Sequence, residues 1–261
     1  MKLFVENLNN VDVSLLDLNR GLVGESWLAG LMLTGNLDEQ SMICDFGIVK
    51  RNVKNWLDEF IDHRLVVPTQ MPGMEITEHN ELMTVKFPHP LGGEFICSAP
   101  KDAFCLIDTT EITPTSVAKW LEVQLENTVP GDISGLKVSL NTELIGGAYY
   151  HYSHGLKKHE GNCQRIVHGH RSKIEIYQNN RRNPELEDYW SACFRNIYIG
   201  TREDITSEHD IDDKAHITFS YSSKQGDFSV TLPKKRIYII DTDSTVELIA
   251  QHIALSCAEK Q

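Results

Sequence analysis

Hydrophobic and polar residues alternate along the start of the chain, in the pattern of β-strands that bury one face. Two strands are predicted there, over 2–17 and 22–34. A looser pattern over 80–110 indicates shorter strands joined by loops. The first half of the chain therefore opens with two strands.

The apolar residues that follow Asp45 change to helical spacing. They are Phe46, Val49, Val53, Trp56, Leu57 and Phe60. Asp45 is a suitable N-cap, because its carboxylate can accept a backbone N–H of the first turn. The helix must end before Pro68, and this places Asp62 and His63 at its C-terminal end.

A second helix is predicted from Thr113, a capping residue that is followed by Pro114 at the first helical position. It runs to about Asn127, and its inward side consists of Val117, Trp120, Leu121 and Leu125. The segment 128–132 ends the helix, and 137–140 is predicted to form another strand.

The later part of the chain is predicted to be rich in strands. They lie at 146–154, 165–177, 217–221, 228–232 and 236–241, with a polar insertion at 178–184 and a hairpin turn at Gly226. The last helix begins at the capping box Ser244-Thr245-Val246-Glu247 and is expected to bury Val246, Ile249, Ala250 and Ile253. The predicted class is α+β, with antiparallel sheets and helices on one face.

Charge and composition exclude several classes of partner. The formal net charge of −12 argues against nucleic acid or an anionic membrane surface as the general partner. No apolar stretch approaches the length of a membrane span, and the N-terminus lacks the apolar core of a signal peptide. The six cysteines have no tight spacing, which favours a reduced, cytoplasmic setting.

Two histidines separated by one glycine, His168 and His170, stand in the strand predicted over 165–177. Side chains at i and i+2 of a strand project from the same face. An antiparallel pairing with the preceding strand could bring His154 over these two rings. Three neutral imidazoles with an open fourth position are typical of a catalytic zinc site. Cys163, five residues before His168, is then a reactive thiol near the metal rather than automatically a ligand.

These residues resemble the 6-pyruvoyltetrahydropterin synthase and 6-carboxytetrahydropterin synthase family. That family combines a strand histidine after an aromatic residue, a cysteine shortly before His-Gly-His, Asp-Phe-Gly, Asp-His and a helix that begins with Pro-Thr. Here the motifs are Tyr150-His151-Tyr152-Ser153-His154, Cys163, His168-Gly169-His170, Asp45-Phe46-Gly47, Asp62-His63 and Pro114-Thr115. A single-domain member carries all of these motifs in one domain, whereas here they are divided between the two halves of the chain.

The division implies two tandem T-fold (tunnelling-fold) units, 1–143 and 144–261. The first has Val23-Gly24-Glu25 where the family has His-Gly-His, so it lacks the zinc histidines but keeps the Asp-His helix. The second keeps the zinc site and the cysteine without an Asp-His helix. In the family, neighbouring subunits together complete one site. We therefore expect Cys163 and the zinc to lie against Asp62-His63, within a chain or between chains.

The resemblance implies a zinc-dependent lyase that acts on 7,8-dihydroneopterin triphosphate. The product would be 6-pyruvoyl- or 6-carboxytetrahydropterin, the latter a step of queuosine biosynthesis. Zn²⁺ would be held by His154, His168 and His170. Cys163, as a thiolate, would abstract a carbon-bound proton, and His63, oriented by Asp62, would relay protons.

The resemblance also implies a glutamate that anchors the pterin ring on the strand after the second helix. Glu143 is the nearest candidate, one position off the family register, and Thr142 occupies the expected position. Basic residues flank the metal strands and could receive a triphosphate or be solvated surface charges. They are Lys157, Lys158, Arg165 and Arg171.

Other interpretations remain open. His-Gly-His also occurs by chance, Asp62-His63 could be a polar helix end, and His151 and His159 are expected to be surface histidines. The chain could be a non-catalytic protein that binds a pterin or purine, or a structural partner that completes another subunit's site. A homo-oligomer is expected, because T-fold units close their sheets by association.

Overall fold

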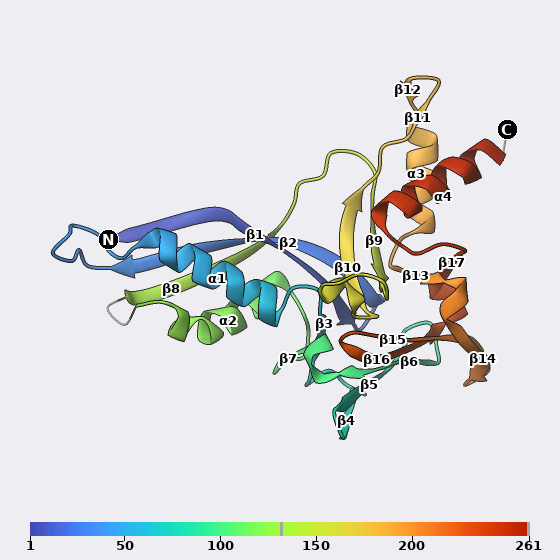
Figure 1. The fold of residues 1–261 in the computed structure, drawn as a ribbon, viewed down its shortest axis with the longest axis horizontal. Helices are drawn as coiled ribbons and strands as arrows, with labels where there is room; N and C mark the ends of the chain where they lie inside the picture. Colours follow the sequence, from blue (N-terminus) through green and yellow to red (C-terminus); the bar gives the residue numbers. More distant parts are fainter. Residues whose placement is uncertain (131–132, 260–261) are drawn as a thin grey trace.

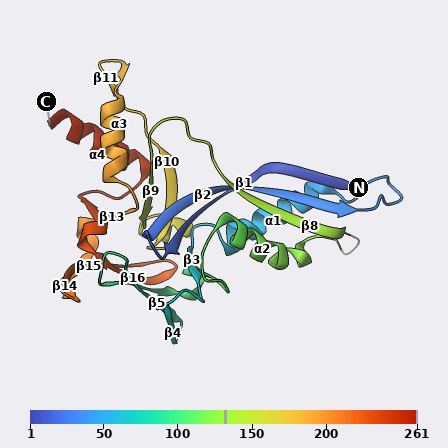
Figure 2. The same cartoon turned by 180° about the vertical axis from the view of Figure 1, so that it is seen from behind.

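The structure is a computed structural model that describes residues 1–130 and 133–259. It is elongated: the first hairpin extends to the N-terminus at one end, and the C-terminal helices lie toward the other (Figure 1). The view from behind shows the same arrangement (Figure 2). Among the described residues, no helix is both long enough and apolar enough to cross a membrane.

The first half is built on a five-stranded sheet with the order β7-β3-β1-β2-β8. Its strands are β1 (Lys2–Asp17), β2 (Gly21–Gly35), β3 (Leu65–Pro68), β7 (Phe104–Ile107) and β8 (Ile133–Thr142). Helices α1 (Phe46–Phe60) and α2 (Pro114–Gln124) share one hydrophobic core with this sheet. Both helices and the two long strands are where the sequence pattern predicts them, and the structure shows that the strands pair as an antiparallel hairpin.

Side-chain caps explain why these two helices begin where they do. The Asp45 carboxylate accepts the backbone N–H of Ile48 at 3.1 Å. The Thr113 hydroxyl accepts the N–H of Ser116 at 3.0 Å, and the Ser116 hydroxyl accepts the N–H of Thr113 at 2.9 Å. Both caps satisfy N–H groups that a helix start leaves without partners.

The second half is built on a four-stranded sheet with the order β10-β9-β13-β17. Its strands are β9 (Tyr149–His154), β10 (His168–Lys173), β13 (Ile197–Thr201) and β17 (Ile237–Ile240). Helices α3 (Pro184–Cys193) and α4 (Val246–Glu259) pack on it around a separate core. The short strands β11 (Tyr177–Gln178) and β12 (Arg181–Arg182) form a small hairpin before α3.

Helix α3 is absent from the sequence prediction, which passes from a polar insertion directly to a hairpin. The Asn183 side chain caps this helix by accepting from Leu186 at 3.2 Å, and Pro184 occupies the first turn. This is the same start signal as in α2, but its apolar face is reduced to little more than Trp190 and the following Phe194. Tertiary packing of these two rings fixes a helix that hydrophobic periodicity alone does not reveal.

A third sheet is shared by the two halves, with the order β14-β15-β16-β6-β5-β4. Its strands are β4 (Glu75–His79), β5 (Leu82–Pro88), β6 (Glu94–Pro100), β14 (Ile205–Ile211), β15 (Lys214–Ser223) and β16 (Gly226–Pro233). Strand β16 pairs antiparallel with β6, Val230 opposite Cys97. The predicted hairpin 217–232 therefore belongs to this sheet, which joins the halves by backbone hydrogen bonds.

Single-turn 3-10 helices connect several of these strands. They are η1 (Lys101–Ala103), η2 (Glu126–Thr128), η3 (Asn162–Gln164), η4 (Arg202–Asp204) and η5 (Lys234–Arg236). The predicted α+β class is confirmed: α1 and α2 pack on the first sheet, and α3 and α4 pack on the second. The sheets also contain parallel pairs, β1 with β3 and β9 with β13, that the sequence analysis does not anticipate.

The two halves repeat one topology around a local two-fold relation. Each has a hairpin, a helix, a strand parallel to the first, three strands in the shared sheet, a further strand and a second helix. In the first hairpin Ser14 is opposite Gly24, and in the second Ser153 is opposite Gly169. The two serines meet in a buried hydrogen bond of 2.7 Å between their hydroxyls. This register places each paired residue of β9 and β10 in correspondence with a residue of β1 or β2.

The start of α4 differs from its prediction. Val246 is 63% exposed and Ala250 is exposed, whereas Ile249 and Ile253 are buried as expected. The Thr245 hydroxyl accepts the N–H of Leu248 at 3.4 Å, so Thr245 rather than Ser244 has the capping role. Ser244 is fully buried and contacts a histidine of the site described below.

A side chain at Gly24 has no room, because the two hairpins cross there. A Cβ atom would lie 1.8 Å from the carbonyl oxygen of Tyr152. Backbone must move to accept it, so Gly24→Ala is expected to destabilise the protein by about 3 kcal/mol. The melting temperature should fall by roughly 6–12 °C, measured by thermal unfolding. Gly146→Ala is the matched control, since its Cβ would meet nothing within 4 Å; equal melting temperatures for the two variants would contradict this packing.

Candidate metal centre

Strands β9 and β10 bring three histidines to one face of the second sheet. His168 lies directly opposite His154, and His170 follows two positions later on the same side. The ring centroids of His154 and His168 are 4.4 Å apart, and that of His170 lies 5.3 Å and 5.5 Å from them. One nitrogen of each ring lies within 4.8 Å of the other two. The geometry is that of three ligands around one ion.

Hydrogen bonds at the Nδ1 atoms show which nitrogens are free for a metal. His154 Nδ1 contacts the Ser244 hydroxyl at 3.0 Å, and His168 Nδ1 donates to the Arg165 carbonyl at 2.9 Å. The Nε2 atoms of both rings are buried and have no hydrogen-bond partner. Metal-ligating histidines characteristically bind through one nitrogen while the other is held by such a neighbour.

The chemical state of the rings also fits a metal. Burial lowers the pKa of His154 and of His168 well below the ordinary histidine value. Both are therefore neutral imidazoles, the form that coordinates a cation. Two orphaned nitrogens in a neutral, buried cluster are costly unless something binds them, so the residues fit Zn²⁺.

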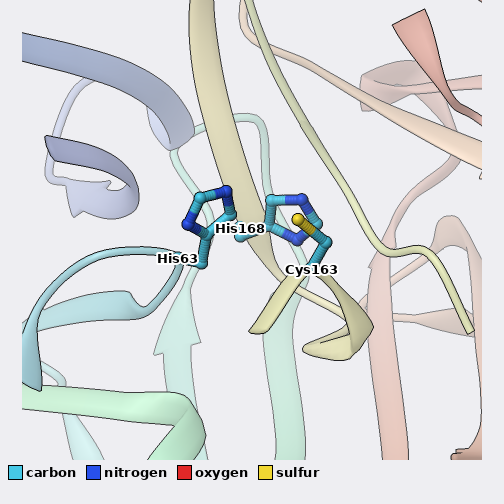
Figure 3. Close-up of side chains that lie close together, drawn as sticks. All are labelled: His63, Cys163 and His168. Atoms are coloured by element: carbon cyan, nitrogen blue, oxygen red, sulfur yellow. The ribbon is translucent and has the colours of Figure 1, made fainter. Parts of the chain in front are cut away.

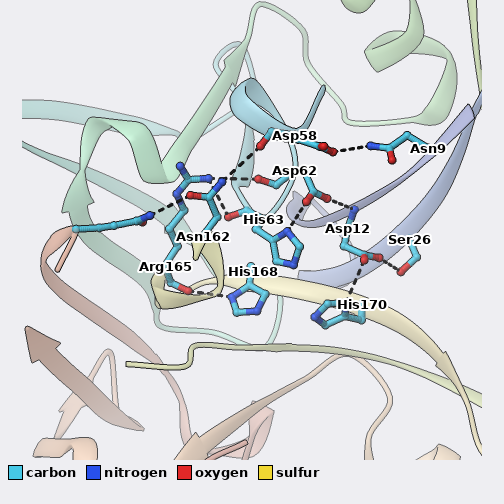
Figure 4. Close-up of polar contacts among 11 residues, drawn as sticks. Asn9, Asp12, Ser26, Asp58, Asp62, His63, Asn162, Arg165, His168 and His170 are labelled. Carbon is cyan, nitrogen blue, oxygen red and sulfur yellow. Dashed lines mark hydrogen bonds and ion pairs between the residues drawn. The ribbon is translucent and has the colours of Figure 1, made fainter. Parts of the chain in front are cut away.

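Asp62 and His63 reach this cluster from the end of α1. His63 has a φ of 54°, in the left-handed region that non-glycine residues adopt at a cost. Two hydrogen bonds to β1 hold the turn: the His63 N–H donates to the Asp12 carbonyl at 2.7 Å, and the Asp12 N–H donates to the Asp62 carboxylate at 2.8 Å. The same carboxyl group pairs with His63 Nδ1 through its other oxygen (Figure 4). The His63 ring is 5.2 Å from that of His168.

Cys163 lies in η3, between the two histidine strands, and is half-buried. Its sulfur and one nitrogen each of His63 and His168 all lie within 4.8 Å of one another (Figure 3). The thiol and the Asp62-His63 pair thus meet within a single chain, at a point where the two halves touch. Because His168 belongs to both groups, the thiol faces the edge of the three-histidine site.

Asp12 is a site residue that the sequence analysis misses. Its carboxylate lies 3.5 Å from His170 Nδ1 and accepts a hydrogen bond from the Ser26 hydroxyl. Although burial alone raises it, contact with His170 holds the pKa of Asp12 below its ordinary value. All three histidines therefore have an oxygen acceptor at Nδ1. The strand that contains Asp12 carries several other polar and charged residues, so no local pattern in the sequence singles it out.

Arg165 is engaged with protein rather than open to substrate. It is buried, and its guanidinium donates to the carbonyls of Asp62 and His63 at 3.2 Å and 3.4 Å. Lys157 pairs with Asp204 at 2.6 Å, and Lys158 with Asp243 at 2.9 Å. The structure thus gives three of the four basic candidates structural partners.

The fourth basic candidate and the predicted pterin anchor lie together elsewhere. Arg171 stacks over the Tyr149 ring at 4.2 Å, and its guanidinium donates to the backbone carbonyl of Glu143. Thr142 and Glu143 are exposed at the end of β8, and neither belongs to the groups that could hold a metal. Their assignment to substrate binding stays a prediction.

The Asp62-His63 pair should give stability a specific pH dependence. Burial by itself lowers the pKa of His63, but its bonds to Asp62 and Cys163 raise it to about 10 from the usual 6.5. The stabilisation is complete below about pH 6.5 and is lost as the pH rises toward 10, because the unfolded chain releases this proton first. We expect the unfolding free energy of metal-free protein, relative to His63→Gln, to decline over that interval in denaturant titrations. A constant difference would contradict the assignment; His79→Gln, an exposed histidine of β4, should behave like the unsubstituted protein.

No family model matches the chain, and no curated protein matches its sequence. Solved structures do match. The chain is similar to 6-pyruvoyltetrahydropterin synthase. The Plasmodium vivax structure gives a TM-score of 0.46 at 19% identity, covering 56% of this chain and 93% of that one, and a variant of it in a catalytic residue gives the same values. The Plasmodium falciparum structure gives a TM-score of 0.45 at 15% identity, covering 54% and 91%. The motifs described above resemble this same family.

Proposed function

We propose that the protein is a zinc-dependent lyase of the pterin synthase type that acts on 7,8-dihydroneopterin triphosphate. The observation that carries the proposal is the meeting of two partial sites. Three histidines of the second half lie against Cys163, and the acid–imidazole pair of the first half completes the cluster. The groups proposed for metal binding and for proton transfer therefore lie together within the described part of one chain.

His154, His168 and His170 would hold the zinc, which when bound supplies Lewis-acid polarisation of the substrate's side-chain oxygens. Asp62 keeps the proton of His63 on Nδ1 and fixes the ring plane, so Nε2 is the atom that exchanges protons. Cys163 lies on the same side as His63 and is suited to remove a carbon-bound proton. His63, whose pKa is raised by Asp62 and Cys163, carries a proton on Nε2 near neutral pH and lies close enough to stabilise the Cys163 thiolate and to donate that proton.

The direct test is to incubate zinc-loaded protein with 7,8-dihydroneopterin triphosphate. We expect release of inorganic triphosphate together with a new pterin product, observed by chromatography and ultraviolet absorbance. The reaction should stop when the zinc is removed by a chelator and resume when zinc is restored. Binding of the substrate without triphosphate release would contradict the proposal.

A non-catalytic pterin- or purine-binding role is the second candidate. Glu143 is exposed and lies outside the metal cluster, so a pterin ring anchored there would lie away from the metal, which favours binding without turnover. A purely structural partner would instead purify without zinc. The unit boundary at 143/144, the homo-oligomer and the cytoplasmic location stay predictions.

A further inference from the structure

The local two-fold relation generates a second site, on the opposite side of the crossed hairpins. The pairing of Ser14 with Gly24 in one hairpin and of Ser153 with Gly169 in the other gives this correspondence. Leu15 stands in the position of His154, Val23 in that of His168, and Glu25 in that of His170. Leu15 and Val23 are buried and apolar, so this second position cannot hold a metal. Any ligand at this second position must therefore be bound by groups other than a histidine cluster.

The residues around this second position also correspond to those around the metal centre. The strand pairings place Asn196 in correspondence with His63, and both residues have a positive φ, of 51° and 54°. At the metal centre the Asp12 carboxylate lies 3.5 Å from His170 Nδ1. At the second position His151 stands for Asp12 and Glu25 stands for His170, and their side chains lie 3.8 Å apart. The second position thus keeps the framework of the metal centre while its ligands are replaced.

A pocket of about 350 Å³ lies at this second position. It is lined by residues of both halves, among them Arg20 from the first and His151, Arg195 and Asn196 from the second. The Arg20 guanidinium donates to the Asn196 side chain at 2.7 Å, as Arg165 donates to the turn at His63. This bond fixes Arg20 at the wall while other N–H groups of its guanidinium stay available.

The charge in this pocket contrasts with the rest of the molecule. The chain carries a formal net charge of −12, with 37 acidic residues. Its arginine–carboxylate ion pairs, within the described residues, are Arg182–Glu187 and Arg202–Asp241. Neither Arg20 nor Arg195 therefore has a direct carboxylate partner, and Glu25 acts on Arg20 only through a longer-range electrostatic interaction. A third guanidinium, of Arg236, donates to the Arg195 carbonyl at 3.4 Å. Burial, followed by the charge of Arg20, lowers the pKa of Arg236, as expected where guanidinium groups gather.

We propose that this pocket binds the phosphate group of a small molecule, through Arg20 and Arg195. Guanidinium groups bind phosphate oxygens through paired, charge-assisted hydrogen bonds, and two that form no direct ion pair in a concave site make a preorganised anion receptor. The volume accommodates a phosphate with a small attached group. The inference concerns a site distinct from the metal centre and is independent of the reaction proposed there.

Isothermal titration of metal-free protein with inorganic pyrophosphate tests the inference, since metal-free protein excludes binding through a zinc ion. We expect saturable one-to-one binding that weakens about tenfold in Arg195→Ala and at least about 100-fold in the double variant Arg20→Ala/Arg195→Ala, in line with the strength of charge-assisted hydrogen bonds. Arg51→Ala, an exposed arginine of α1, is the matched control and should bind as the unsubstituted protein does.

A second variant guards against loss of folding through the Arg20–Asn196 bond. Ser191→Asp adds a negative charge to the wall of the pocket without removing either arginine, and it should abolish binding. Unchanged affinity in Arg195→Ala and Ser191→Asp, or no binding by the unsubstituted protein, would overturn the inference. These variants are expected to leave zinc content and turnover unchanged, so the outcome of this test is separate from that of the proposed lyase function.

Discussion

Replacing His168 by alanine is expected to lower zinc affinity by more than about 100-fold and to remove turnover. Loss of an outer-shell partner of a metal-bound histidine already costs 10–100-fold, and His168 is proposed as a direct ligand. Its ring is fully buried, and its unpartnered Nε2 lies in the group with His154 and His170. Metal content after dialysis, measured by plasma mass spectrometry, should fall from one zinc per chain to a trace.

Thermal unfolding gives an independent reading of the same variant. A ligand that binds only the folded state raises its stability according to free concentration and affinity. Zinc should therefore raise the melting temperature of the unsubstituted protein and leave that of His168→Ala unchanged. His79→Ala, an exposed histidine of β4, should retain both zinc and the shift. If His168→Ala kept full zinc occupancy, the three-histidine site would be wrong.

Replacing Cys163 by alanine is expected to separate catalysis from metal binding. The thiol lies beside His63 and His168, outside the three-histidine group. A positioned proton-transfer group contributes about 10²–10⁴-fold to a rate, so turnover should fall by roughly 10³-fold while zinc content stays at one per chain. Steady-state kinetics together with metal analysis of the same preparation check both parts.

Two other outcomes for Cys163→Ala would each have a definite meaning. Loss of zinc would show that the thiol is a ligand, through the alternative group with His63 and His168. Unchanged turnover would remove the thiol from the mechanism and favour the binding protein. Cys193→Ala, a half-buried cysteine of α3, should leave both zinc and turnover unchanged.

Helices and strands can be predicted directly from the sequence where the hydrophobic pattern and the capping residues indicate the same element. Alternation over the first strands, the Asp45 cap and the Thr113-Pro114 start each locate an element that the structure contains. Helix α3 is missed because two large rings, rather than a repeated apolar face, anchor it. The exposed Val246 is predicted as core because periodicity gives the spacing of a helix but not the rotation at which it docks.

The sequence by itself determined which candidate metal-binding and proton-transfer groups the chain contains. Strand periodicity places His168 and His170 on one face, and the end of a capped helix places Asp62 and His63 together, because both follow from local backbone geometry. The sequence also divides these groups between two halves. It does not say whether the halves meet within one chain or between chains.

Only the tertiary structure decided how these groups combine. The crossing of two hairpins at Gly24 and Gly169, and a sheet shared by both halves, bring Cys163 to His63 within one chain. The same crossing brings Asp12 to His170 and creates the arginine pocket at the related position. These contacts join residues far apart in sequence, and they depend on strand register and close backbone approach, which no local pattern of residues encodes.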